Sequence, residues 1–194
     1  MLACALQDEQ VNHLVIILYS EQGKGKSTWI RRLLPPQWRE YYRNGMVNPD
    51  NKDHQLLLST HLIINMEEFE GARIGDLAGL KRVITQESVT ERKAYDMQAY
   101  NFIRHASFIA STNNRQCLQD IGGNRRFLPS SIITLDYRTP VNYEGIYAQA
   151  YALIKEGYRY WYEGEEINEL NRHNELHRMK DPVEENPVSY THLR

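Results

Sequence analysis

Three apolar runs have the pattern of buried strands. They span residues 14–19 (LVIILY), 62–66 (LIINM) and 107–111 (SFIAS), and each is followed by polar residues or a glycine-containing turn. Near-continuous apolar strands that alternate with helical stretches are typical of a parallel sheet covered on both faces. A fourth strand is expected at residues 131–135, downstream of Pro129.

Helical periodicity occupies the segments between these runs. A helix over residues 27–34 must stop at Pro35-Pro36, which cannot continue it. Further helices are predicted over residues 74–83, 143–162 and, more exposed, 165–179. In the longest of them, one stripe of apolar side chains contains Ile146, Tyr147, Ala150, Tyr151, Ile154, Tyr158 and Trp161. Its tyrosines are expected to pack along this stripe, with a subunit contact as the alternative.

Together these elements predict an α/β fold with a mainly parallel central sheet flanked by helices. Residues 1–162 are expected to form the core and residues 163–188 a C-terminal helical extension. Residues 189–194 (SYTHLR) differ in character and resemble translated sequencing-adapter sequence. We therefore expect a non-native tail there, and a chain that is a fragment truncated after Val188.

The composition is that of an ordinary globular domain. The 194 residues are 41% apolar and 25% charged, which disfavours a disordered or fibrous chain. The net charge of −2 excludes a wholly basic nucleic-acid-coating protein. The charge is nevertheless uneven, with nine basic and five acidic residues in 73–126 and eight acidic against three basic in 161–188. A basic middle suits a domain that meets a polyanion on one side.

Several features point to the cytoplasm. No apolar run approaches the roughly 18 residues that a membrane span needs. The first residues lack the basic region of a signal peptide. The two cysteines, Cys4 and Cys117, lie far apart and match no metal-binding spacing, so we expect free thiols in a reducing compartment.

The segment 20–27 (SEQGKGKS) matches the P-loop pattern G-x-x-x-x-G-K-[ST] in Gly25, Lys26 and Ser27. Ser20 replaces the first glycine, and Gly23 adds flexibility. A predicted strand enters the loop and a predicted helix leaves it, as the motif requires. The alternative is a Gly/Lys-rich surface turn.

The P-loop pattern has a specific chemistry. Successive backbone N–H groups point inward and form an anion nest at the N-terminus of a helix. Lys26 is expected to bridge the β- and γ-phosphates of a nucleotide, and the Ser27 hydroxyl to ligate Mg²⁺.

Other polar residues follow the predicted strands. Glu67 and Glu68 end the second strand, and we assign Glu67 to the metal and Glu68 to the attacking water. The alternative is an acidic first turn of a helix. Asn113 follows the third strand and could bind the γ-phosphate or the water, unless it is only a turn residue. Arg125 and Arg126 could reach a phosphate in their own site or a neighbour's; the alternative is a solvated turn.

In this order the motifs identify a family. The chain resembles the virulence-associated protein E (VirE-like) P-loop domain of prophages and mobile elements, which is related to superfamily III helicases and AAA+ ATPases. The resemblance covers roughly residues 3–188. Besides the strand with Glu67 and Glu68, it is carried by EQGKGKST (21–28), LKRVIT (80–85), ERKAYD (91–96), RHASFIASTNN (104–114) and GGNRRFLP (122–129).

The resemblance implies a set of roles. ATP would be bound by Glu21, Gln22, Gly23, Lys24, Gly25, Lys26, Ser27 and Thr28. It implies that Glu67 and Glu68 are Walker B acids, that Asn113 is a sensor, and that Arg125 or Arg126 is an arginine finger or phosphate sensor. In related helicases a hairpin touches DNA; here it would fall near residues 89–102, with Arg92 and Lys93.

The resulting hypothesis is a Mg²⁺-dependent, helicase-like ATPase that acts on DNA during replication of a phage or mobile element. An arginine finger acting in trans would require a homo-oligomeric ring, expected to be a hexamer. Two alternatives remain open, namely an ATP-dependent binding switch without motor activity and a small-molecule or nucleoside kinase.

Overall fold

The computed structural model of the chain describes residues 1–6, 11–69, 74–92, 97–118 and 124–179. The expected tail at residues 189–194 lies outside these ranges, and the domain division at residue 162 stays a prediction. Within the described ranges, no helix is long and apolar enough to cross a membrane.

Five parallel strands form the central sheet in the order β2-β3-β6-β1-β7. Every residue of β3 and β6 is buried, because these strands are covered on both faces. This arrangement confirms the predicted α/β fold. The strands are β1 (Val15–Tyr19), β2 (Tyr42–Asn44), β3 (Ile63–Met66), β6 (Ser107–Thr112) and β7 (Phe127–Ser131).

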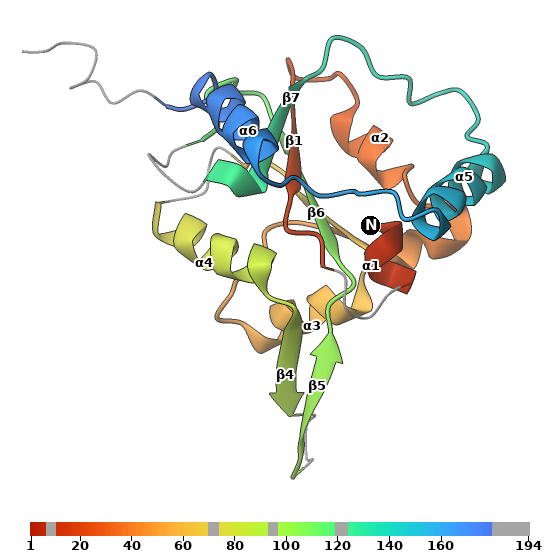
Figure 1. Cartoon of the computed structure of the whole chain (residues 1–194), viewed down its shortest axis with the longest axis vertical. Helices are drawn as coiled ribbons and strands as arrows, with labels where there is room; N and C mark the ends of the chain where they lie inside the picture. Colours follow the sequence, from red (N-terminus) through yellow and green to blue (C-terminus); the bar gives the residue numbers. More distant parts are fainter. Residues whose placement is uncertain (7–10, 70–73, 93–96, 119–123, 180–194) are drawn as a thin grey trace, which may run out of the picture.

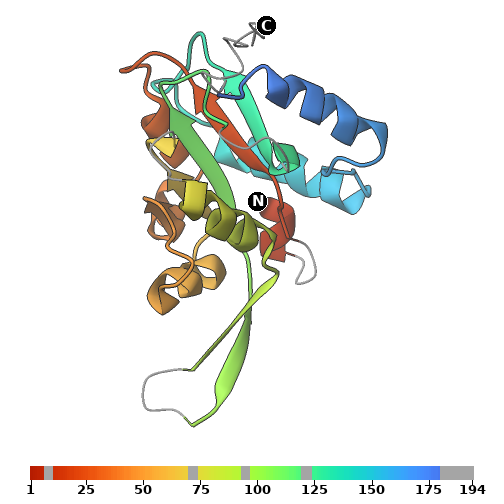
Figure 2. The ribbon, with the colours of Figure 1, turned by 90° about the vertical axis from the view of Figure 1, so that its left-hand side faces the viewer.

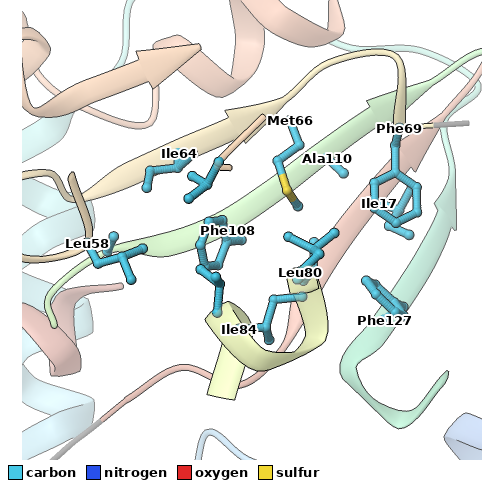
Figure 3. Packing of buried hydrophobic residues seen from close by; sticks show 14 of the residues in the cluster. Ile17, Leu58, Ile64, Met66, Phe69, Leu80, Ile84, Phe108, Ala110 and Phe127 are labelled. Carbon is cyan, nitrogen blue, oxygen red and sulfur yellow. The ribbon is translucent and has the colours of Figure 1, made fainter. Parts of the chain in front are cut away.

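Two hydrophobic clusters lie on opposite faces of the sheet. On one face, Leu80 and Ile84 of α4 (Ile74–Thr85) pack against Ile17, Phe108 and other strand residues (Figure 3). On the other, Ile30 of α2 (Lys26–Arg31) belongs to the smaller cluster with residues of β1, β3 and β6. Figure 1 shows α4 on one side of the sheet and α2 on the other.

Three predicted strands are confirmed, but the fourth was placed wrongly. The structure has β7 at Phe127–Ser131, not at residues 131–135. Pro129, which precedes the expected strand, pairs with Ile17 inside β7. Proline is tolerated there because β7 is the edge strand next to β1, and its missing N–H can fall on the open side.

The predicted helices are present with different ends. The helix expected over 143–162 is α5 (Tyr143–Lys155), and it stops before Gly157, whose φ of 74° is typical of the residue that ends a helix. The last helix is α6 (Glu165–Glu175). The structure also has elements that the sequence did not predict: α1 (Leu2–Leu6), a 3₁₀ turn η1 (Pro36–Tyr41), α3 (Lys52–Thr60) and a 3₁₀ turn η3 (Asn124–Arg126).

The apolar stripe of α5 is only partly covered. The Tyr143 hydroxyl donates a hydrogen bond to the carbonyl of Arg32, and the Tyr147 hydroxyl donates one to that of Leu33. Both carbonyls lie just beyond the end of α2. No residue of α5 is buried, and Ile146 is 55% exposed. The expectation that the tyrosines pack along the stripe therefore holds for two of them, whereas Tyr151, Tyr158 and Tyr162 are exposed.

An antiparallel hairpin, β4 (Ser88–Arg92) and β5 (Ala99–Ile103), projects from the body of the molecule (Figure 2). It lies where the family resemblance placed a hairpin. Its base meets α3, which contacts both strands.

A buried arginine fastens the base of this hairpin to the core. Arg104 is fully buried, and its guanidinium donates hydrogen bonds to the carbonyls of Val83, Gln86, Ala106 and Asn12 at 2.9–3.3 Å, and to that of Ile84. It thereby satisfies carbonyls at the C-terminal end of α4 that have no partner within the helix. Burial lowers the pKa of Arg104 to about 10, so it stays charged at neutral pH.

Replacing this arginine should therefore be costly. We expect Arg104→Ala to lower the free energy of unfolding by roughly 3–5 kcal/mol, because several buried carbonyls lose their donor at once. The matched control is Arg82→Ala, which removes an exposed ion pair with Asp50 (3.2 Å) and should cost less than about 1 kcal/mol. Urea unfolding of both variants measures the difference, and equal losses would contradict this role of Arg104.

Candidate nucleotide site

The loop between β1 and α2 lies at the carboxyl edge of the sheet (Figure 1). Gly23 and Gly25 have φ of 82° and 79°, in the left-handed region that favours glycine. Gly25 is also the N-cap of α2, so backbone N–H groups at the start of this helix are available to an anion. The loop lines a cavity of about 290 Å³ together with residues that follow β3 and β6.

Lys26 occupies the centre of this arrangement and is buried. Its ammonium donates to the carbonyl of Ser20 (3.0 Å), the hydroxyl of Ser20 (2.9 Å), the carbonyl of Glu21 (3.1 Å) and Oδ1 of Asn113 (2.9 Å). Ser20 replaces the first glycine of the motif, and its hydroxyl helps to hold the lysine. The bond to Asn113 joins the P-loop to the end of the neighbouring strand.

The acidic pair lies across the same cavity. Glu67 is half-buried after β3, and Glu68 is exposed. Glu68 has a φ of 52°, and among the described residues it is the one non-glycine with a positive φ. Such strained backbone is concentrated at functional sites, because the surrounding structure must hold it in place.

The cavity brings together most of the residues that the sequence singled out. Its lining contains Gln22 to Thr28, Glu67, Glu68 and Asn113. Glu21 is not in this lining, because its side chain is exposed beside Lys24 (3.7 Å). Ser27 and Glu67 both line the cavity, and a hydroxyl and a carboxylate are hard oxygen groups of the kind that Mg²⁺ prefers. Among the described residues there is no cluster of three or more His, Cys, Asp or Glu side chains suited to a metal.

Arg125 and Arg126 are not part of this cavity. They end η3, directly before β7, and Phe127 pairs with Val15 at the start of β1. Because β1 and β7 are parallel, the arginines lie at the amino edge of the sheet, roughly a strand length of 15 Å from the P-loop. The structure therefore does not bring them to the phosphate site of the same chain.

The two arginines instead line a second cavity of about 390 Å³. Its wall includes the exposed aromatic residues Tyr160 and Trp161. The Nε of Arg126 is buried and, within the described part of the chain, has no hydrogen-bond partner.

Sequence reasoning missed one residue beside the P-loop. Tyr137 lies in the connection between β7 and α5, and a Cβ placed on Gly25 would lie 2.4 Å from its ring. No motif marks this connection, so nothing in the sequence pointed to it.

The hairpin presents Arg92 and Tyr100 as exposed side chains. Lys93, its expected partner in binding DNA, lies outside the described residues.

A protein-family model matches most of the chain. A profile of the virulence-associated protein E-like domain matches residues 10–179. The chain belongs to this family. The match confirms the resemblance found in the sequence. A comparison with curated proteins gave no match.

Solved structures of the NrS-1 C-terminal region, in the apo form, are similar to the chain. One has 16% sequence identity and a TM-score of 0.49, and the match covers 89% of this chain and 45% of that one. An A form of the same region has 16% identity, a TM-score of 0.44 and coverages of 92% and 39%. The chain thus spans less than half the length of these structures.

The contact between Gly25 and Tyr137 predicts unequal effects of alanine in the P-loop. Gly23→Ala should lower the free energy of unfolding by about 1–2 kcal/mol, because alanine is strained at a positive φ. Its methyl group would meet no other atom within 4 Å. Gly25→Ala should cost about 1–3 kcal/mol more, because its methyl group also overlaps the Tyr137 ring. Chemical unfolding of both variants tests this, and the double variant Gly25→Ala/Tyr137→Ala should return to the Gly23→Ala value. Equal costs of the two single variants would contradict the contact.

Proposed function

We propose that this domain binds ATP and hydrolyses it with Mg²⁺. The observation that carries the proposal is the 2.9 Å bond between Lys26 and Asn113, which joins the P-loop to the end of β6 beside Glu67 and Glu68. Phosphoryl transfer to water requires a particular set of groups around one anion nest: a lysine, a hydroxyl, two carboxylates and an amide.

Each group has a defined task. The N–H groups at the start of α2 bind phosphate oxygens, and Lys26 exchanges its internal acceptors for the β- and γ-phosphates. Ser27 and Glu67 hold Mg²⁺, which when bound neutralises charge on the phosphates. Glu68 orients the attacking water and accepts its proton, while Asn113 positions the water or the γ-phosphate.

The arginine pair completes the site of a neighbouring chain. Because Arg125 and Arg126 lie at the opposite edge of the sheet, their phosphate contact is made in trans, by one copy to the next. Repeating this head-to-tail contact produces a ring if the rotation closes. An arginine that reaches the γ-phosphate stabilises the charge that develops during transfer.

The work driven by hydrolysis is remodelling of DNA in the replication of a phage or mobile element. Three features support this: the family, the basic stretch 73–126, and the projecting hairpin with exposed Arg92 and Tyr100. Basic and aromatic side chains on one hairpin match the phosphates and bases of a single strand. Hydrolysis at this site needs only ATP and water as reactants, whereas a kinase would also have to bind an acceptor beside the γ-phosphate.

Glu68→Gln should bind ATP with unchanged affinity but hydrolyse it at least about 100-fold more slowly, because the general base is lost. Arg125→Ala/Arg126→Ala should also be inactive. Mixing the two inactive proteins should restore activity, since each Glu68→Gln chain can supply arginines to a neighbour whose Glu68 is intact. Steady-state phosphate release measures all three.

The outcomes separate the alternatives. Absence of activity in the mixture would contradict a contact in trans. Tight ATP binding by the wild-type chain without turnover at any protein or DNA concentration would indicate a binding switch instead.

Arg92→Ala and Tyr100→Ala should weaken single-stranded DNA binding and leave ATP hydrolysis without DNA unchanged. Loss of one charge should also reduce the slope of log affinity against log salt by roughly 0.7 for Arg92→Ala, whereas Tyr100→Ala should keep the slope. Arg172→Ala on α6 is the control of equal charge on another exposed surface. Equal effects of Arg92→Ala and Arg172→Ala on DNA affinity would contradict the assignment of the hairpin.

A further inference from the structure

The connection between β7 and α5 passes beside the P-loop. It leaves β7 at the carboxyl edge of the sheet and runs past α2 to α5 (Figure 1). Within it, the Tyr137 ring packs against Gly25 so closely that a Cβ there would lie 2.4–2.5 Å from two ring carbons. An aromatic side chain therefore borders the loop that is proposed to hold the phosphates.

Hydrogen bonds hold the connection on both sides of Tyr137. The N–H of Ile132 donates to the carbonyl of Tyr19 at 2.9 Å, and the Arg32 guanidinium donates to the carbonyl of Thr139. Between these anchors, the Asp136 carboxylate accepts from the N–H groups of Arg138 and Thr139, both at 3.0 Å. A hydrogen bond from the Thr139 side chain, together with these two backbone bonds, lowers the pKa of Asp136 to about 2, so the carboxylate is charged at neutral pH.

The strand order indicates on which side of β1 the base of a bound nucleotide would lie. Asn113 and the two glutamates follow β6 and β3, which lie on one side of β1. Tyr137 follows β7, which lies on the other side of β1. A triphosphate whose γ-phosphate faces Glu68 must therefore extend its base away from β6, toward the connection that carries Tyr137.

We propose that Tyr137 is the base-binding wall of the nucleotide site and that it takes a purine. This inference rests on the proposed function and adds to it the residue that selects the base. The Arg138 guanidinium lies over the ring, 5.5 Å from its centre, and its side chain is exposed. That ring face is therefore open to a flat group, and a base would displace the exposed arginine from it. A purine overlaps the ring more than a pyrimidine does, so stacking favours purine nucleotides.

The test compares a ligand with a base and a ligand without one. Calorimetry measures the binding of MgATP and of magnesium tripolyphosphate to the wild-type chain, Tyr137→Ala and Tyr137→Phe. Tyr137→Ala should weaken ATP binding about ten- to a hundred-fold, the effect of losing one stacked base, and leave tripolyphosphate within about two-fold. Tyr137→Phe should retain ATP affinity. Tyr158→Ala, at a tyrosine that is 60% exposed elsewhere, is the matched control.

Base preference provides a second readout. The wild-type chain should bind ATP and GTP more tightly than CTP and UTP, and Tyr137→Ala should reduce this difference. Equal loss of ATP and tripolyphosphate binding in Tyr137→Ala would show that the tyrosine only supports the P-loop, and would overturn the proposal. So would unchanged ATP affinity, or equal affinity of the wild-type chain for ATP and UTP. A wild-type chain that binds neither ATP nor tripolyphosphate would overturn the proposed function itself.

Discussion

Parallel pairing of β1 with both β6 and β7 is the constraint from which the site follows. Parallel pairing places the carboxyl ends of β1, β6 and β7 side by side, so Tyr19 pairs with Thr112 on one side and with Ser131 on the other. The P-loop after β1 then has Asn113 on one side and the connection with Tyr137 on the other. The strand register alone therefore brings the side chains of the candidate site together at the carboxyl edge of the sheet.

The same constraint separates the two arginines from the P-loop. Since β7 runs parallel to β1, whatever precedes β7 lies at the amino edge, a strand length from the P-loop. The molecule thus carries a nucleotide site at one edge and an arginine pair at the other. In the proposed ATPase the two halves of the catalytic site would therefore come from different chains, and activity would depend on assembly. The projecting hairpin, fastened by Arg104, is a third separate surface.

Much of this was predictable because it depends on local pattern. Continuous apolar runs marked three strands, and the polar residues after them marked the edge where Lys26, Glu68 and Asn113 meet. The rest depends on partners distant in the sequence. The sequence did not indicate that β7 contains Pro129, because proline is tolerated in a strand only at the edge of a sheet, and the strand order is needed to show that β7 is an edge strand. Nothing in the sequence distinguishes the buried Arg104 from the other basic residues of 73–126, and Tyr137 belongs to no motif. Whether Arg125 lies at the amino or the carboxyl edge of the sheet could also not be predicted, because this depends on how β7 pairs with β1.

The central claim is that the carboxyl edge holds the triphosphate and that Lys26 binds it. A crystal structure of the chain with Mg²⁺ and a non-hydrolysable ATP analogue tests this most directly. The account predicts phosphates in the loop 20–28, with the Lys26 ammonium moved from Asn113 to a phosphate oxygen and the metal beside Ser27 and Glu67. An analogue bound in the cavity beside Trp161, with Lys26 still on Asn113, would contradict it.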